Sequence, residues 1–210
     1  MFTIDNTPIN RGFQPMPAGT NENVKLVRVA YEPFKNDGTG DNVLKFEFKD
    51  EQNRSFTHNE WEIKPDRIKQ NAQAWNTDYK ELLEKELASM SERIKHIMAA
   101  FMPYEDIKVA GSTWADFARA IIDNLGDRFE DVPVRIKLIL NKKDYCTFPK
   151  RAINDFIVKM SAPNTFSYNP KYDRIEPLGK TDSDLNDILN GTPALEEPIA
   201  TRAEDDDLSF

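Results

Sequence analysis

The 210-residue sequence predicts a mixed β/α fold: a five-stranded antiparallel barrel with a long helical insertion between its third and fourth strands. Two patterns carry this prediction. Apolar residues alternate with polar ones before residue 66 and after residue 126, and between these points they recur at intervals near 3.6 residues. We expect a flexible arm over residues 1–22, one domain over residues 23–175, and a disordered linker with an acidic tip over residues 176–210.

The first part of the domain predicts three strands in an antiparallel meander. The first strand is expected over residues 24–34, where β-branched and aromatic residues are dense. In the second, Leu44, Phe46 and Phe48 share one face and charged residues occupy the other. The third covers residues 56–63. Short loops of turn-forming residues separate the three, as in a meander.

The central segment predicts helices. Residues 66–102 form either one long amphipathic helix or two consecutive ones, with the break of the second case at Asn76-Thr77. A further helix is expected to begin at Thr113, which with Asp116 forms a pattern like a capping box, and to end at Gly126. Residues 66–126 are therefore the expected helical insertion.

Strand character returns over residues 134–140, 145–148 and 156–160. Three strands, a helical segment and two or three further strands follow one another in the order of an OB barrel, although the helical segment here is much longer than usual. Other mixed antiparallel folds share this order.

Few residues could support catalysis or bind a metal. Cys146 is the single cysteine, and His58 and His96 are the only histidines and lie far apart in sequence. Glu60 and Glu62 share a strand face, but no further carboxylate cluster accompanies them, so a solvated or cross-strand-paired face is the favoured interpretation. We expect no enzymatic activity, no cofactor and no metal.

The sequence also predicts a cytoplasmic protein that does not enter a membrane. No apolar run approaches the roughly 20 residues that span a bilayer. The first residues have neither the basic start nor the apolar block of a signal peptide.

The formal net charge of −8 is unevenly distributed. Residues 176–210 hold ten acidic and two basic residues, which account for all of it, so the other 26 acidic and 26 basic residues cancel. Residues 132–175 carry nine basic and three acidic residues, a local charge of +6. A basic segment beside an acidic tail is typical of a protein whose tail competes with DNA for its own groove. The alternative is a solvated surface with chance clustering.

Basic and aromatic residues interleave in two groups, as in sites where bases stack on rings and cations neutralise phosphates. Because the first loop and the loop between the fourth and fifth strands flank one cleft of an OB barrel, we expect the two groups to meet. The first group is Arg28, Tyr31, Phe34 and Lys35. The second is Arg135, Lys137, Lys142, Lys143, Tyr145, Phe148, Lys150, Arg151 and Lys159, with an extension through Phe166, Tyr168, Lys171, Tyr172 and Arg174.

Not every aromatic ring is a candidate for stacking. Core packing is the favoured role for Phe46, Phe48, Phe56, Phe117, Trp61, Trp75 and Trp114. Stacking and packing stay equally open for Tyr31, Phe34, Tyr145 and Phe148.

The chain ends on Asp205-Asp206-Asp207-Leu208-Ser209-Phe210, an acidic run closed by a terminal aromatic residue. This stretch resembles the C-terminal tip of single-stranded DNA-binding proteins of bacteria and tailed phages, which in the bacterial family reads Asp-Asp-Asp-Ile-Pro-Phe. The resemblance covers the tip alone. It implies sequence-independent binding of single-stranded DNA without a metal. It also implies recruitment of polymerase, helicase or primase through Asp205, Asp206, Asp207, Leu208 and Phe210.

Two functions are therefore weighed. The first is a single-stranded DNA-binding protein that coats exposed strands without sequence specificity during phage DNA replication or recombination and recruits replication proteins by its tip. The second is a phage adaptor or assembly protein that forms a homodimer through its helices, docks a partner by the tip and does not touch DNA. A gel-shift assay with oligo(dT) at low salt separates them.

Overall fold

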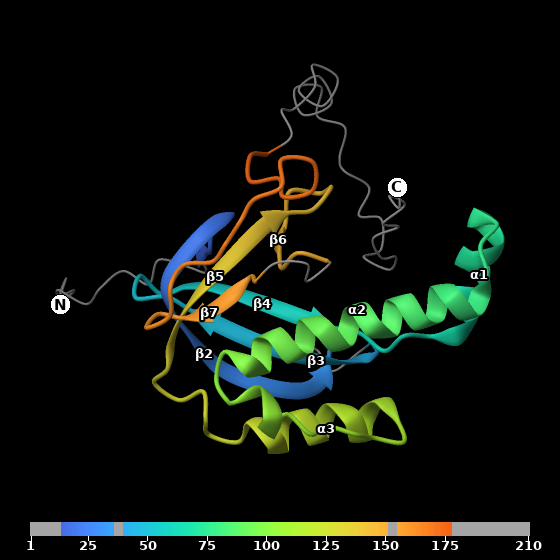
Figure 1. Ribbon diagram of the computed structural model, residues 1–210, viewed down its shortest axis with the longest axis horizontal. Coiled ribbons are helices and arrows are strands. Elements are labelled where there is room, and N and C mark those ends of the chain that lie inside the picture. Colours follow the sequence, from blue (N-terminus) through green and yellow to red (C-terminus); the bar gives the residue numbers. More distant parts are fainter. Residues whose placement is uncertain (1–13, 36–39, 151–154, 178–210) are drawn as a thin grey trace, which may run out of the picture. The chain divides into compact units, whose positions relative to one another are not determined.

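A twisted, mostly antiparallel sheet with two of the three α-helices packed against it forms the body of the protein (Figure 1). The computed structural model describes residues 14–35, 40–150 and 155–177. The expected acidic tail, Arg151 and most of the expected arm therefore lie outside the described residues. None of the helices in the described part of the chain is long and apolar enough to cross a membrane.

The sheet follows the expected order of strands. Three strands precede the helices and three follow them, as predicted, and one short strand comes before them all. The strands are β1 (Gln14–Pro15), β2 (Gly19–Pro33), β3 (Asn42–Lys49), β4 (Arg54–Glu60), β5 (Pro133–Leu140), β6 (Cys146–Thr147) and β7 (Ile157–Lys159).

The strands pair in the order β1-β4-β3-β2-β5-β6, and β7 also pairs with β5. All pairs are antiparallel except β1 with β4. The expected meander is thus confirmed, but over the described ranges the ladders form an open path of six strands, with β7 paired to β5 beside it. The closed five-stranded barrel of the prediction is not what these ladders describe.

Strand β2 changes its partner along its length. Gly19 lies opposite Leu138 of β5, whereas Pro33, at the other end, lies opposite Asn42 of β3. The register shifts twice near the changeover, and Asn23 has a left-handed backbone with φ of 53°. Bulges of this kind bend a strand and increase its twist. One strand therefore joins the two halves of the sheet.

The expected N-terminal arm is too long, because residues 14–22 belong to the sheet. The Met16 amide donates a hydrogen bond of 3.1 Å to the Ser55 carbonyl, and the Met16 side chain is fully buried. Apolar residues are sparse in this stretch, so it offers no periodicity to read. Its order comes from pairing with β4 and β5, which lie far away in the sequence.

The helical insertion agrees with the prediction of two consecutive helices and a third. They are α1 (Pro65–Trp75), α2 (Tyr79–Ala99) and α3 (Trp114–Leu125), with a short 3₁₀ turn, η1 (Tyr104–Asp106), after α2. Asn76 ends α1 in a left-handed conformation, and the Asp78 side chain accepts hydrogen bonds at the start of α2. The Thr113 hydroxyl accepts from the Asp116 amide, and α3 ends at Gly126, as expected.

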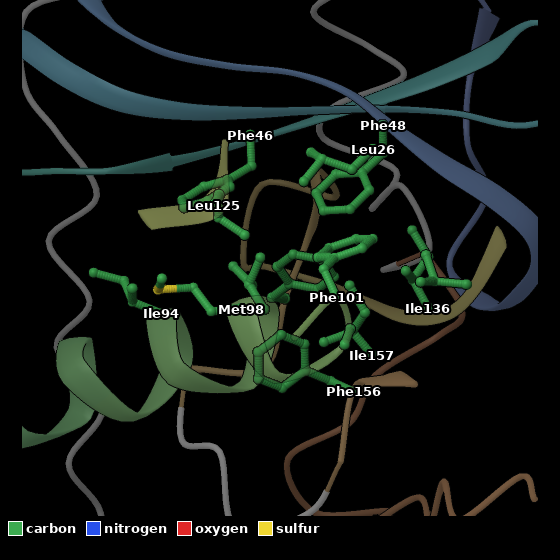
Figure 2. Close-up of a cluster of buried hydrophobic side chains, with 14 of the residues drawn as sticks. Leu26, Phe46, Phe48, Ile94, Met98, Phe101, Leu125, Ile136, Phe156 and Ile157 are labelled. Carbon is green, nitrogen blue, oxygen red and sulfur yellow. The ribbon is translucent and has the colours of Figure 1, made fainter. Parts of the chain in front are cut away.

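The hydrophobic core lies between the sheet and helices α2 and α3. Figure 2 shows Phe46 and Phe48 from β3 facing Met98 of α2 and Leu125 of α3, and all four are fully buried. The alternation in β3 and the helical spacing in α2 and α3 place these residues on facing surfaces. Burial of each such side chain contributes about 1.5–3 kcal/mol. The expected core role of Phe46, Phe48 and Phe56 is confirmed.

Candidate nucleic-acid interface

Lys137 of β5 is buried and has a structural role, so it is not exposed to contact a nucleic acid. Its side chain is 2% exposed, and its ammonium group donates hydrogen bonds to Asp173 Oδ2 at 2.7 Å and to the Ser167 carbonyl at 2.6 Å. The same group lies 4.7 Å from the centroid of the Tyr168 ring. The prediction that Lys137 contacts phosphate is therefore wrong. Alternation places it on the outer face of β5, but the later segment 166–174 covers that face.

The covering segment is also tied to the turn between β5 and β6. The Leu140 amide donates to the Arg174 carbonyl at 2.7 Å, and the Arg174 guanidinium contacts both Asp144 and the Asn141 carbonyl. Within the turn, Asn141 Oδ1 accepts from the amides of Lys143 and Tyr145 at 2.9 and 3.0 Å. Segments about 30 residues apart in sequence thus form one surface, next to each other in Figure 1.

Three tyrosines on this surface are exposed to solvent, and we call them the tyrosine platform: Tyr145, Tyr168 and Tyr172. Tyr145 and Tyr172 are 68% and 54% exposed. The Tyr168 hydroxyl hydrogen-bonds Thr20 Oγ1 at 2.8 Å, which joins the platform to β2. Lys142, Lys143 and Lys171 are exposed on the same two segments. The structure therefore brings Lys142, Lys143 and Tyr145 of the second predicted group together with Tyr168, Lys171 and Tyr172 of its extension.

Phe148 belongs to the core, contrary to its assignment as a candidate for stacking. It is 1% exposed, and its ring packs edge-on against Phe48 and Phe56 with centroid distances of 5.6 and 5.0 Å. Because β6 is so short, the alternation of polar and apolar residues could not show from the sequence which side chains face the core. Lys150, close by, has an exposed side chain.

Arg135 is only partly accessible. Its side chain is 11% exposed and donates a hydrogen bond of 2.8 Å to Glu22 Oε1 on β2. The neighbouring carboxylate neutralises much of the charge that a phosphate would meet. Arg135 therefore contributes less to a binding surface than its sequence position suggested.

In the first predicted group, Arg28 is paired with acids of the sheet, and so is the neighbouring Lys45. Arg28 forms ion pairs with Glu47 at 2.6 Å and with Glu32, and Lys45 lies 3.1 Å from Glu32. The hydrogen bond from Arg28 lowers the pKa of Glu32 to about 2, against the smaller opposing effect of burial. Tyr31 is half-buried and packs on the core. The charge of Arg28 is therefore compensated by acids, and only part of the Tyr31 ring is accessible.

Phe34 and Lys35 are exposed. Trp61, for which the sequence favoured core packing, is exposed beside them. The Trp61 ring lies 4.8 Å from the Phe34 ring at 48°, and both are exposed. The two residues follow the ends of β2 and β4, which the meander places on the same side of the sheet. The expected meander already places the ends of these two strands near each other, and this could have predicted that Trp61 lies beside Phe34.

The two predicted groups do not meet. The turn of residues 141–145 lies beside the N-terminal end of β2, where Gly19 is opposite Leu138, and Phe34 follows the C-terminal end of the same strand (Figure 1). At about 3.3 Å per residue, the 15 residues of β2 trace a path of about 45–50 Å. The expected single cleft is replaced by two separate aromatic surfaces.

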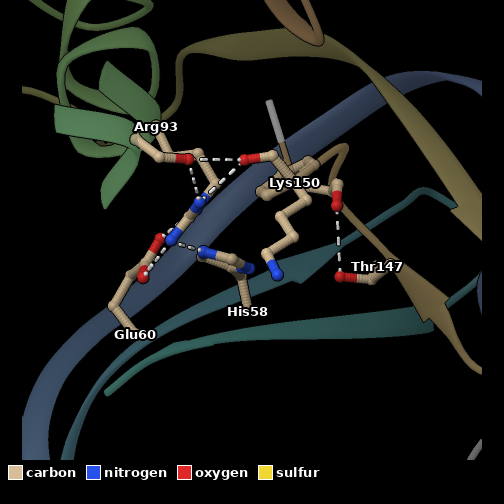
Figure 3. Close-up of polar contacts among 7 residues, drawn as sticks. His58, Glu60, Arg93, Thr147 and Lys150 are labelled. Atoms are coloured by element: carbon tan, nitrogen blue, oxygen red, sulfur yellow. Dashed lines mark hydrogen bonds and ion pairs between the residues drawn. The ribbon is translucent and has the colours of Figure 1, made fainter. Parts of the chain in front are cut away.

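A buried ion pair holds α2 against the sheet. Glu60 of β4 accepts hydrogen bonds from Arg93 Nε at 2.7 Å and Nη2 at 2.9 Å, and His58 Nε2 lies 2.9 Å from it (Figure 3). Arg93 Nη1 also donates to the Lys150 carbonyl at 2.8 Å. Burial alone would raise the pKa of Glu60, but His58 and Arg93 outweigh it and lower that pKa to about 2. Glu60 thus has a structural role in positioning the 148–150 segment.

Cys146, the single cysteine of the sequence, is half-buried at the start of β6. Its thiol donates to the Met16 carbonyl at 3.3 Å, and burial raises its pKa. A thiol in this state is a weak nucleophile, since the thiolate is the reactive form. Cys146 therefore acts as a packing residue between β1 and β6.

No protein-family model, curated protein or solved structure matches this chain. The tip residues Asp205, Asp206, Asp207, Leu208 and Phe210 lie outside the described residues. The geometry of the tyrosine platform is accordingly the main observation from which a function can be argued.

Proposed function

We propose that this protein binds single-stranded DNA without sequence specificity through the tyrosine platform. The observation that carries the proposal is the exposure of Tyr145 and Tyr172 on a surface held by the buried Lys137–Asp173 ion pair and by the contact of Arg174 with Asp144. Large rings exposed to water on an ordered segment offer stacking area that every base can use. Lys171 Nζ lies over the Tyr172 ring, 5.1 Å from its centroid, so the ring already holds a cation on one face. Stacking contributes roughly 1–3 kcal/mol per base.

The phosphates are bound by lysines beside these rings. Lys142 and Lys143 are exposed on the β5–β6 turn, and Lys171 is exposed next to Tyr172. Such contacts release counterions, so the affinity decreases with a log–log slope of about −0.7 per phosphate contacted. A basic rim around neutral rings fits a ligand with a charged backbone and uncharged, stackable bases.

We also propose that the sheet is an OB-like barrel in which α1 to α3 are an insertion. The support is β2, which pairs with β5 over its first part and with β3 over its second part. A strand that pairs with different neighbours over its two parts and carries bulges bends the sheet, and a barrel can close only if its sheet is bent. The order of strands and helices is also that of an OB barrel.

In this proposal the protein performs no reaction and works in the cytoplasm, where it coats strands exposed in DNA replication or recombination. The tip recruits polymerase, helicase or primase, as its resemblance to the tips of single-stranded DNA-binding proteins implies. Replacing Phe210 by Ala keeps every acidic residue, so recruitment should drop with little change in DNA affinity. Pull-down and gel-shift measurements on this one variant separate the two activities.

A gel-shift assay with oligo(dT) at low salt tests the DNA-binding proposal. The unaltered protein should shift the oligonucleotide, and Tyr145→Ala with Tyr172→Ala should remove most of the shift at high salt. Tyr104→Ala is the matched control, since Tyr104 is 63% exposed on η1, outside the platform. If the unaltered protein shifts nothing, the adaptor function replaces this proposal.

A further inference from the structure

A groove of about 730 Å³ lies between the C-terminal end of α2 and strand β7. Lys95, His96 and Ala99 line it from the helix, and Ile157 and Lys159 line it from the strand. This volume is within the range of about 300–1,000 Å³ typical of ligand sites. The groove is separate from the tyrosine platform, because β7 pairs with residues 134–136 of β5 and the platform adjoins the opposite end of that strand.

Strand β7 presents an edge to this groove. The Phe156 carbonyl accepts from the Lys137 amide at 2.8 Å, and the Met160 amide donates to the Pro133 carbonyl at 3.0 Å. Residues at even positions thus direct their main-chain groups to β5. Since main-chain groups alternate along a strand, those of Ile157 and Lys159 point away from β5. The Lys159 carbonyl accepts a hydrogen bond of 3.0 Å from the Ala162 amide, so the edge offers both main-chain groups of Ile157 and the amide of Lys159. Over the described ranges, no strand pairs with this edge of β7.

The groove combines an apolar wall with a positive charge. Ala99, Ala100 and Met102 supply apolar surface. Lys95 and Lys159 are exposed cations, and Asp155 is the one carboxylate among the lining residues, so these two positive charges exceed its single negative charge by one. The charge therefore favours an acidic occupant.

We propose that this groove binds an extended acidic peptide of a partner protein, which adds to β7 as a further strand. An open strand edge supplies main-chain hydrogen bonds, and the facing helix supplies the pocket for alternate side chains. The peptide places apolar side chains on the wall formed by Ala99 and acidic ones near Lys95 and Lys159. The site goes beyond DNA binding and does not depend on it.

The probe is an acetylated and amidated peptide, Glu-Val-Asp-Phe-Glu-Val, titrated to millimolar concentration into the isotope-labelled full-length protein. Amide resonances of Ile157 and Lys159 should shift most. A peptide N-methylated at every amide, which cannot donate main-chain hydrogen bonds to a strand edge, should not bind, and neither should one with lysines in place of its acids. Lys95→Glu and Lys159→Glu should each weaken binding at least threefold.

Lys85→Glu is the matched control, since Lys85 is exposed on α2 but does not line the groove. Ala99→Trp should block binding with an unchanged melting temperature. Equal binding of the N-methylated peptide, or no shift at millimolar peptide, overturns the proposal. So does self-association that Ala99→Trp abolishes, because the occupant is then a second copy. If oligo(dT) shifts the Ile157 and Lys159 amides instead, the groove belongs to the DNA interface and the proposal is wrong.

Discussion

The two groups of basic and aromatic residues look alike in sequence but differ in how the fold uses their charges. Around Arg28, the cations lie on the outer face of β2 and β3 and pair with Glu32 and Glu47 of the same strands. In the second group, Lys137 and Arg174 pair with acids from a distant segment and so order a surface of tyrosines. A basic residue in the sequence therefore does not by itself predict a phosphate contact, because acidic side chains of the same protein can pair with it.

The largest expected effect is on stability, from Lys137→Met. Removing Lys137 leaves Asp173 buried without its cation, and breaking such a pair costs about 3–5 kcal/mol. Arg28→Met breaks only half-exposed pairs and should cost at most about 1 kcal/mol. Urea unfolding of both variants measures the difference. Adding Asp173→Asn to Lys137→Met should restore part of the loss, and equal costs for the two single variants would contradict the comparison.

The next effect is on DNA affinity at high salt, where stacking outlasts the phosphate contacts. Tyr145→Ala and Tyr172→Ala should each cost roughly 1–3 kcal/mol of binding free energy, because both rings are exposed. Phe34→Ala should cost less, since the Phe34 ring already packs against Trp61. Fluorescence titration with oligo(dT), with melting measured alongside, gives these values. A greater loss for Phe34→Ala would move the site to the other end of β2.

The third effect is electrostatic and should disappear with salt. Lys142→Glu with Lys143→Glu should weaken binding equally for all sequences and reduce the magnitude of the log–log salt slope by about 1.4, for two phosphate contacts. Arg28→Glu should leave the slope unchanged, because Arg28 is paired with acids of the sheet. Binding that responds instead to Lys80→Glu or Lys85→Glu, on α2, would place the interface on the helices.

The smallest expected effect is on the pH dependence of the free energy of unfolding, through the ion pair of Arg28 with Glu32. The pKa of Glu32 is lowered from 4.5 to about 2, so the stability this ion pair supplies is present above pH 4.5 and is lost as the pH falls toward 2. Because Glu32 is 31% exposed and solvent screens the pair, the loss should stay below about 1 kcal/mol. Urea unfolding between pH 6 and pH 3 should show a flatter profile for Arg28→Met. An identical profile would mean that the pair contributes nothing.

Local chemistry was sufficient to predict the helices and most strands. The break at Asn76, the cap at Thr113 and the stop at Gly126 each depend on the conformational preferences of one or two neighbouring residues. Alternation likewise placed Phe46 and Phe48 in the core, because a strand buried on one face repeats every two residues. These features are readable from sequence because their causes lie within a few residues.

Tertiary structure alone decided which candidate residues face solvent. Lys137 is buried because residues 166–174 fold back over β5, and Phe148 is buried because Phe48 and Phe56 approach it from strands about 90–100 residues earlier. Trp61 meets Phe34 only through the pairing of β2, β3 and β4. Burial and ion pairing depend on contacts between segments distant in sequence, and no local pattern records which segments will meet.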